Sequence, residues 1–173
     1  MADVSTHILP DVLAPGLKLW FVGTAAGPKS AAVGAYYAHA GNRFWRTLHE
    51  AGITPTRFAP HDFPKLIELG VGLTDFCKTG WGVDSAIARD QFDVAGFRKK
   101  VERLKPRALA FTSKTSASLW LEKPTGRIAP GRQPSSGNAP AVFVLPSPSG
   151  LATSYWSAEP WREVGDWLGQ IAE

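Results

Sequence analysis

Residues 18–28 have the sequence KLWFVGTAAGP, and this stretch indicates how the chain begins to fold. Lys18 to Gly23 is short, apolar and rich in aromatic and β-branched residues, as expected of a buried strand. In the turn Gly23 to Gly27, glycine lets the backbone approach a ligand closely, although an ordinary turn into a helix has the same composition. The turn lacks the third glycine of a dinucleotide fingerprint and the Gly-Lys-Ser/Thr ending of a phosphate loop.

The remainder of the chain alternates buried strands with helices. The predicted strands are Lys18 to Gly23, Val71 to Phe76, Ala108 to Thr112 and Ala141 to Leu145. Helical patterns cover Asn42 to Ala51, Pro60 to Leu69, Val94 to Leu104, Lys114 to Leu121 and Ser157 to Ile171. Because parallel strands need crossovers that usually carry helices, we expect a three-layer α/β/α fold with a central, mainly parallel four-stranded sheet. Lys123 to Pro140 is rich in Gly, Pro and Ser and is predicted to be a surface loop.

The composition limits the class of protein. A chain of 173 residues with 44% hydrophobic content fits one domain, residues 1–173. One cysteine, Cys77, excludes an intramolecular disulfide and a cysteine-ligated iron-sulfur cluster. The N-terminal residues show no signal sequence, so we expect a cytoplasmic protein, near the nucleoid if bacterial, that is monomeric and makes no membrane contact. The net charge of +4 and the pI of 9.4 favour polyanions without proving a nucleic-acid partner.

An aromatic segment and a buried-strand carboxylate are the first candidate site residues. Tyr36, Tyr37 and His39 precede the helix that contains Phe44, so core packing explains them less well than it explains Phe44. A flat aromatic ring at that point can stack on a nucleobase. Asp75 ends an apolar strand, where a charge needs hydrogen-bond partners. It either caps a loop, reads a base edge, or polarises a water beside a sugar whose oxocarbenium-like state a nearby anion stabilises.

The segment after the fourth predicted strand is the next candidate. Pro146 to Leu151 is stiffened by two prolines and offers serine hydroxyls and backbone N–H groups that can hold a phosphate. Leu151 follows Gly150, and enzymes that extrude a base often fill the gap with such an apolar wedge.

With these motifs assembled, the chain resembles the uracil-DNA glycosylase superfamily over nearly its whole length. Gly23 to Gly27 and Asn42 to Trp45 are similar to the Gly-Ile-Asn-Pro-Gly and Asn-x-Phe-Trp motifs of its mismatch-specific uracil and thymine DNA glycosylases. Ser147 to Gly150 resembles the Asn-Pro-Ser-Gly motif of that branch. Tyr36 to His39 and Gly82 to Ile87 look like the hypoxanthine-DNA glycosylase branch.

The resemblance implies roles for these residues. The expected catalytic residues are Asp75, His39 and Thr24, the expected base-binding residues are Tyr37, Ala25, Gly27, Phe44 and Asn42, and the expected DNA-binding residues are Ser147, Ser149, Gly150, Leu151 and Lys114. Relatives often have asparagine or aspartate at the position of Ala25 to orient the attacking water, so we expect Asp75 to carry that polar role here. His39 either orients Asp75, stabilises the leaving base or is structural. The resemblance implies no metal or organic cofactor.

The predicted function is therefore a monofunctional glycosylase that flips uracil out of single- or double-stranded DNA and hydrolyses its N-glycosidic bond. One alternative is hypoxanthine as the base, which the segment Tyr36 to His39 suggests. A second is a catalytically silent binder of damaged or abasic DNA, which Ala25 makes plausible. A small-molecule hydrolase on the same fold is the third, although it would have no use for Leu151 or the basic loop.

Overall fold

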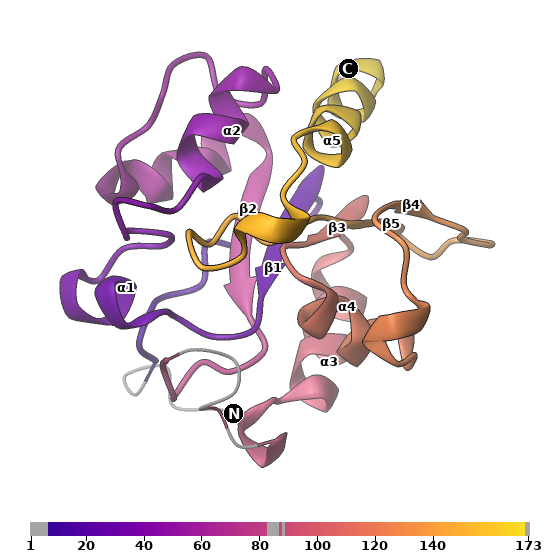
Figure 1. The fold of residues 1–173 in the computed structure, drawn as a ribbon. Helices are drawn as coiled ribbons and strands as arrows, with labels where there is room; N and C mark the ends of the chain where they lie inside the picture. The colour runs from indigo at the N-terminus through magenta and orange to yellow at the C-terminus, as the bar shows by residue number, and fades with distance from the viewer. Residues whose placement is uncertain (1–6, 83–86, 88, 172–173) are drawn as a thin grey trace.

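The computed structural model describes residues 7–82, 87 and 89–171, and its centre is a twisted five-stranded sheet (Figure 1). The strands, in chain order, are β1 (Leu19–Gly23), β2 (Val71–Asp75), β3 (Ala108–Phe111), β4 (Gly131–Gln133) and β5 (Ala141–Val144). Their order across the sheet is β2-β1-β3-β5-β4. All neighbouring pairs are parallel except β4 with β5. Four strands were expected, and β4 corrects that number to five.

Strand β4 was missed because nothing in its composition distinguishes it from a loop. Gly131–Gln133 is only three residues long, contains no apolar run and is partly exposed. It exists because its backbone pairs with β5, with Gly131 opposite Val144 and Gln133 opposite Val142. The segment that was expected to be one surface loop therefore contains an edge strand and, before it, a 3-10 turn at Thr125–Arg127.

The other four strands match their predicted positions: β1 begins one residue later than predicted, and β2, β3 and β5 each end one residue earlier. Buried parallel strands are apolar on both faces, which explains why they are visible as continuous apolar runs. The residue after each of three strands still donates a backbone hydrogen bond to the neighbouring strand: Phe76 to Gly23, Thr112 to Val22 and Leu145 to Phe111.

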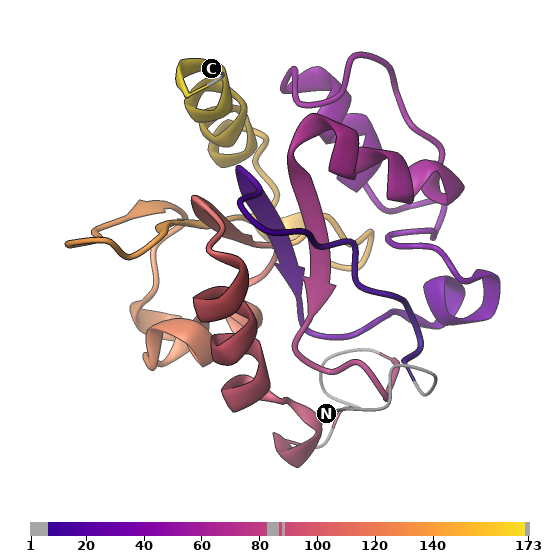
Figure 2. The same cartoon turned by 180° about the vertical axis from the view of Figure 1, so that it is seen from behind.

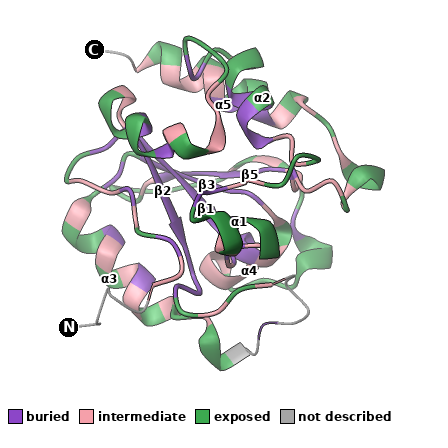
Figure 3. Cartoon of the chain, turned by 90° about the vertical axis from the view of Figure 1, so that its left-hand side faces the viewer, coloured by how far each residue is buried: buried purple, intermediate pink, exposed green. Residues whose placement is uncertain are grey.

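Helices cover both faces of the sheet, as predicted (Figures 1 and 2). The helices are α1 (Pro28–Val33), α2 (Phe44–Glu50), α3 (Val94–Leu104), α4 (Lys114–Leu121) and α5 (Glu159–Gln170), and the 3-10 helices are η2 (Pro60–Leu69), η4 (Arg89–Gln91), η5 (Thr125–Arg127) and η6 (Thr153–Tyr155). Residues of α2, η2 and α5 pack in one core cluster with Phe21, and residues of α3 and α4 pack in the other with Trp20. Figure 3 shows the buried strands between helices whose outer sides are exposed.

Two helices differ from expectation. Residues 60–69 form a 3-10 helix, and Pro64 lies inside it, where a proline removes the N–H that an α-helix would use. Helix α1 was not predicted, because its six residues carry no apolar stripe. It follows the glycine turn after β1 and so lies at the carboxyl edge of the sheet, with Gly27 as its N-cap residue.

Aromatic packing fixes α2 and α5 on the sheet. The ring of Phe21 stacks on Trp161 of α5 with 5.8 Å between centroids and meets Phe44 of α2 edge to face at 5.2 Å. Pairs of this kind add roughly 0.5 to 1.5 kcal/mol beyond the area they bury. The start of α2 is thereby held beside β1, close to the point where the sheet becomes polar.

Candidate active site

Three strands change from apolar to polar at the same level, and this change creates the site. In the parallel register Gly23 of β1 lies opposite Asp75 of β2. Thr112 follows β3 on the other side of β1 and donates its backbone N–H to Val22 O. Side chains alternate between faces along a strand, so Gly23, Asp75 and Thr112 continue the face on which Leu19 and Phe21 meet α2 and α5.

Gly23 leaves the space that the carboxylate occupies. A Cβ atom on residue 23 would lie 2.5 Å from Asp75 Oδ1, 3.3 Å from the Tyr37 hydroxyl oxygen and 3.6 Å from Thr112 Oγ1. Any side chain here would displace Asp75, which is only 6% exposed. Glycine is therefore required at the end of β1 so that three polar groups can meet above it.

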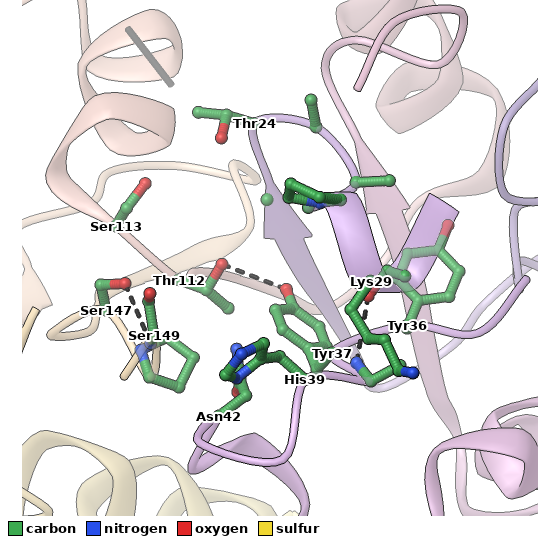
Figure 4. Close-up of a pocket in the computed structure, with 18 of the residues that line it drawn as sticks. Thr24, Lys29, Tyr36, Tyr37, His39, Asn42, Thr112, Ser113, Ser147 and Ser149 are labelled. Atoms are coloured by element: carbon green, nitrogen blue, oxygen red, sulfur yellow. Dashed lines mark hydrogen bonds between the residues drawn. The ribbon is translucent and has the colours of Figure 1, made fainter. Parts of the chain in front are cut away.

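A cavity of about 980 Å³ opens above these groups at the carboxyl edge of the sheet (Figure 4). Its volume lies at the upper end of the range usual for ligand sites. The walls come from the turn after β1 and helix α1, from the aromatic segment before α2, from the start of α4 and from the loop after β5. The residues that line the cavity therefore come from segments that the sequence analysis singled out one by one.

Tyr37 forms one wall of the cavity and has an unusual backbone. Its φ of 51° lies in the left-handed region, which a non-glycine residue adopts only when its surroundings hold it there. Phe44 stacks on the ring with 3.9 Å between centroids and planes 13° apart. Ser30 also holds the segment around Tyr37, because its Oγ accepts the backbone N–H of Ala38 at 3.0 Å.

The hydroxyl of Tyr37 is 3.1 Å from Thr112 Oγ1 (Figure 4). Thr112 Oγ1 also lies 3.3 Å from Val22 O, to which it donates, so this hydroxyl links the Tyr37 side chain to the backbone of β1. Burial, and secondly the nearby Asp75 carboxylate, raise the pKa of Tyr37 above its ordinary value. The hydroxyl therefore stays protonated, and the ring is a neutral aromatic surface.

Tyr36 also lines the cavity and anchors the same segment. Its hydroxyl donates to Pro10 O at 3.0 Å and accepts a hydrogen bond from Lys78 Nζ at 2.9 Å. Lys78 in turn forms an ion pair with Asp11 at 3.0 Å. Burial, followed by the charge of Asp75, raises the pKa of Tyr36 well above its ordinary value. Through these contacts Lys78, three residues after Asp75, is joined to Tyr36, the residue before Tyr37.

His39 lies at the mouth of the cavity and is exposed. Its Nδ1 accepts the backbone N–H of Gly41 at 2.9 Å, which requires that this nitrogen carry no proton. The proton of the neutral ring is therefore on Nε2, which makes that atom a hydrogen-bond donor. Asn42 also lines the cavity, and its Oδ1 accepts the N–H of Phe44 at 2.9 Å in a turn just before α2, whose N-cap residue is Arg43.

The loop after β5 forms the opposite wall and ends in an exposed apolar side chain. Ser147 Oγ accepts the N–H of Ser149 at 3.3 Å, and Ser149 Oγ accepts the N–H of Leu151 at 3.2 Å. The backbone turns between Ser149 and Ala152 through a hydrogen bond of 3.0 Å. Leu151 is 85% exposed, so its side chain has almost no contact with the rest of the described chain.

Most of the residues singled out in the sequence come together in this cavity. Those that line it are Thr24, Ala25, Gly27, Tyr37, His39, Asn42, Asp75, Ser147, Ser149, Gly150 and Leu151. Phe44 does not line it, because it is buried beneath Tyr37 and supports that ring. Lys114 is the exposed first residue of α4 and lies beside the lining residues Ser113 and Thr115. Residues 83–86, which carry part of the resemblance to the hypoxanthine branch, lie outside the described residues.

Thr112 and Ser30 were missed. Both line the cavity and hold the aromatic segment, Thr112 through Tyr37 and Ser30 through Ala38. The position of Thr112 at the end of an apolar strand, like that of Asp75, is a signal that could have found it. Ser30 has no comparable signal, because only the fold brings α1 beside residue 38.

Within the described residues, no three histidine, cysteine or acidic side chains lie close enough together to hold a metal ion. Cys77, which is buried, has no described cysteine partner. In the same part of the chain, no helix has the length and apolar character needed to cross a bilayer.

Comparison with known proteins gives two matches. The model of the uracil DNA glycosylase superfamily matches residues 10–167. A solution NMR structure of a candidate uracil DNA glycosylase from Methanosarcina acetivorans is similar to this chain with a TM-score of 0.66 and 22% sequence identity. The similarity covers 93% of this chain and 96% of that one, and at this identity it speaks for the fold. The family model extends over most of the chain and includes every strand and all the residues that line the cavity except Leu9, so the chain belongs to the uracil DNA glycosylase superfamily.

Proposed function

We propose that this protein is a monofunctional DNA glycosylase that removes uracil from DNA. The observation that carries the proposal is the buried carboxylate of Asp75, which faces the same cavity as the neutral aromatic ring of Tyr37. A carboxylate beside a flat ring suits a reaction in which a base is held by stacking while positive charge develops on the sugar.

The extruded base stacks on Tyr37, and Phe44 supports that ring from its other side. Base–aromatic stacking contributes roughly 1 to 3 kcal/mol. Asp75 polarises the attacking water and stabilises the oxocarbenium-like sugar. Ala25 has no polar side chain at the position where relatives often orient water, so Asp75 is the side chain that performs this task.

As the base leaves, it takes the electron pair of the N-glycosidic bond and becomes an anion. His39 presents a donor at Nε2 near the mouth of the cavity, and this proton stabilises that anion without a change in the charge of the ring. Thr24 contributes a second polar group on the wall next to Ala25. The serine hydroxyls and backbone amides of the loop after β5, with Lys114, contact the phosphates, and Leu151 fills the space left in the duplex.

Cleavage of labelled oligonucleotides tests the proposal. Wild type, Asp75→Asn and Asp75→Ala are incubated with single-stranded and duplex DNA that contains uracil, and alkali then breaks the abasic sites. We expect strand breaks with the wild type and none with either variant. Asp166→Asn is the matched control, because Asp166 is exposed on α5 and does not line the cavity. Binding without cleavage by the wild type would contradict the proposal and favour a silent binder of damaged DNA.

Hypoxanthine is the second candidate base. It is favoured by the segment Tyr36 to His39, which resembles the hypoxanthine branch and lines the cavity. A duplex that contains hypoxanthine, added in competition with the uracil duplex, distinguishes the two. Faster release of hypoxanthine would assign the enzyme to that base while keeping Asp75 in the same role.

A further inference from the structure

Arg43 connects the start of α2 to the loop that carries Leu151. Its backbone N–H donates to Pro148 O at 2.8 Å, and its Nη1 donates to Ser149 O at 3.3 Å. The guanidinium carbon also lies 5.1 Å from the centre of the ring of Trp156, which directly follows η6. Three contacts from one residue therefore hold the loop at Pro148 and Ser149 and the chain that follows it at Trp156, more than a hundred residues away in the sequence.

The carbonyl that Arg43 contacts is the one that closes the turn. Ser149 O accepts the N–H of Ala152 at 3.0 Å as well as Nη1 of Arg43, and Leu151 stands within this turn. The backbones of Gly150 and Gly41 also lie close together, because a Cβ on Gly150 would lie 3.0 Å from Gly41 O. The turn is thus seated directly against the residues that precede α2.

The next residue in the chain, Phe44, supports the ring of Tyr37. Consecutive residues therefore hold the two parts that base extrusion requires, the surface that receives the base and the side chain that replaces it. We propose that Arg43 is a positioning residue that holds the Ser149–Ala152 turn so that Leu151 projects at a set place relative to Tyr37. This inference rests on the proposed function, since it assumes that a base is extruded.

The role predicts an effect that depends on the substrate. In a duplex, the extruded base leaves a gap that Leu151 must enter, whereas a single strand has no partner strand to hold apart. Arg43 should therefore matter for duplex DNA and much less for single-stranded DNA. Direct binding of a phosphate by Arg43 would instead affect both substrates, because both carry the same backbone charge.

The test measures single-turnover excision of uracil from both substrates by Arg43→Gln, Arg43→Lys, Leu151→Ala and the double variant of Arg43→Gln with Leu151→Ala. We expect Arg43→Gln to lower the duplex rate by about tenfold, as for the loss of one charge-assisted hydrogen bond, with less than about a twofold change on single strands. The lysine variant should recover part of the loss, because it keeps the charge near Trp156. The double variant should be no slower than the slower single variant.

Arg46→Gln is the control, because Arg46 is exposed on α2, the helix that follows Arg43, and pairs only with Glu50, at 3.8 Å, among the described acidic residues. Thermal unfolding identifies any variant that is not folded. Extrusion is measured separately by the fluorescence of 2-aminopurine placed beside the uracil in a duplex, which does not depend on bond cleavage.

The outcomes distinguish the proposed glycosylase activity from the proposed positioning role of Arg43. Fluorescence that rises with the wild type and not with Arg43→Gln, in the absence of cleavage, would overturn the glycosylase and support the role of Arg43. Equal losses on single-stranded and duplex DNA, or additive losses in the double variant, would overturn the role of Arg43 and leave the glycosylase intact. A wild type that neither extrudes nor cleaves would overturn both.

Discussion

Replacing Gly23 by alanine tests whether the position of the Asp75 carboxylate controls the reaction. A Cβ at residue 23 would lie 2.5 Å from Asp75 Oδ1, whereas ordinary contact begins at 3.4 Å. The carboxylate must therefore retreat by about 0.9 Å, and a misplacement of about 1 Å can lower a rate by about a hundredfold. The φ of Gly23 is not in the left-handed region, so alanine adds no backbone strain. We expect Gly23→Ala to excise uracil about a hundredfold more slowly than the wild type.

The assay is single-turnover excision from a labelled duplex, with each rate divided by the folded fraction from thermal unfolding. Gly169→Ala controls for the substitution itself, because no described atom outside its own helix and chain neighbours lies within 4 Å of a Cβ there. Gly165→Ala controls for lost stability, because its Cβ would collide with the carbonyl oxygen of Ala51, which does not line the cavity. Gly165→Ala should lower the Tm and leave the rate of the folded protein unchanged.

Two results would refute the reasoning. If Gly23→Ala excises uracil at the wild-type rate, the position of the Asp75 carboxylate does not limit the reaction. If its rate falls only in proportion to the folded fraction, as expected for Gly165→Ala, the glycine serves the fold and has no separate effect on the carboxylate.

Two further predictions concern stability. Tyr37→Phe should lower the free energy of unfolding by about 1 kcal/mol, because the hydrogen bond between the Tyr37 hydroxyl and Thr112 Oγ1 is lost. Denaturant unfolding of Tyr37→Phe, Thr112→Val and the double variant measures the coupling between the two side chains, and purely additive losses would contradict the prediction. Burial alone would raise the pKa of Asp11, but Lys78 and Lys100 hold it below its ordinary value, so stability should fall as the pH drops below about 4. Asp11→Asn, although less stable at neutral pH, should show a smaller decrease in Tm over that acid range, and parallel Tm profiles would count against the ion pairs.

The strands of the parallel sheet could be predicted because each is buried on both faces. Every residue of Leu19–Gly23 and of Val71–Asp75 is buried. The first strand is a continuous apolar run that ends at Gly23, whereas the second also contains Gly72 and Thr74 and ends at the charged residue Asp75. The same logic identified Asp75, since a carboxylate at the end of such a run requires an explanation. Pro146 to Leu151 was recognisable because its prolines and serines follow a buried strand directly.

Residues whose role depends on contacts with other parts of the chain could not be predicted. Strand β4 is held by backbone hydrogen bonds to β5, and such bonds leave no trace in side-chain composition. Phe44 was expected in the base pocket, but its apolar ring is buried under Tyr37, where it supports the wall from behind. The pairing of Arg43 with Ser149 joins segments that are distant in the chain, and nothing local to either indicates the other.

By itself, the sequence determined the alternation of strands and helices, the glycine turn after the first strand, the placement of Asp75 at a strand end and the apolar Leu151, because these follow from local patterns of burial and backbone freedom. Only the tertiary structure decided that β1 lies between β2 and β3. That order places the Asp75 carboxylate and Thr112 Oγ1 around Gly23 from the strands on its two sides, and the Tyr37 hydroxyl reaches the same point. The physical reason is that strand order and close approach depend on how whole elements pack, which local sequence patterns do not contain.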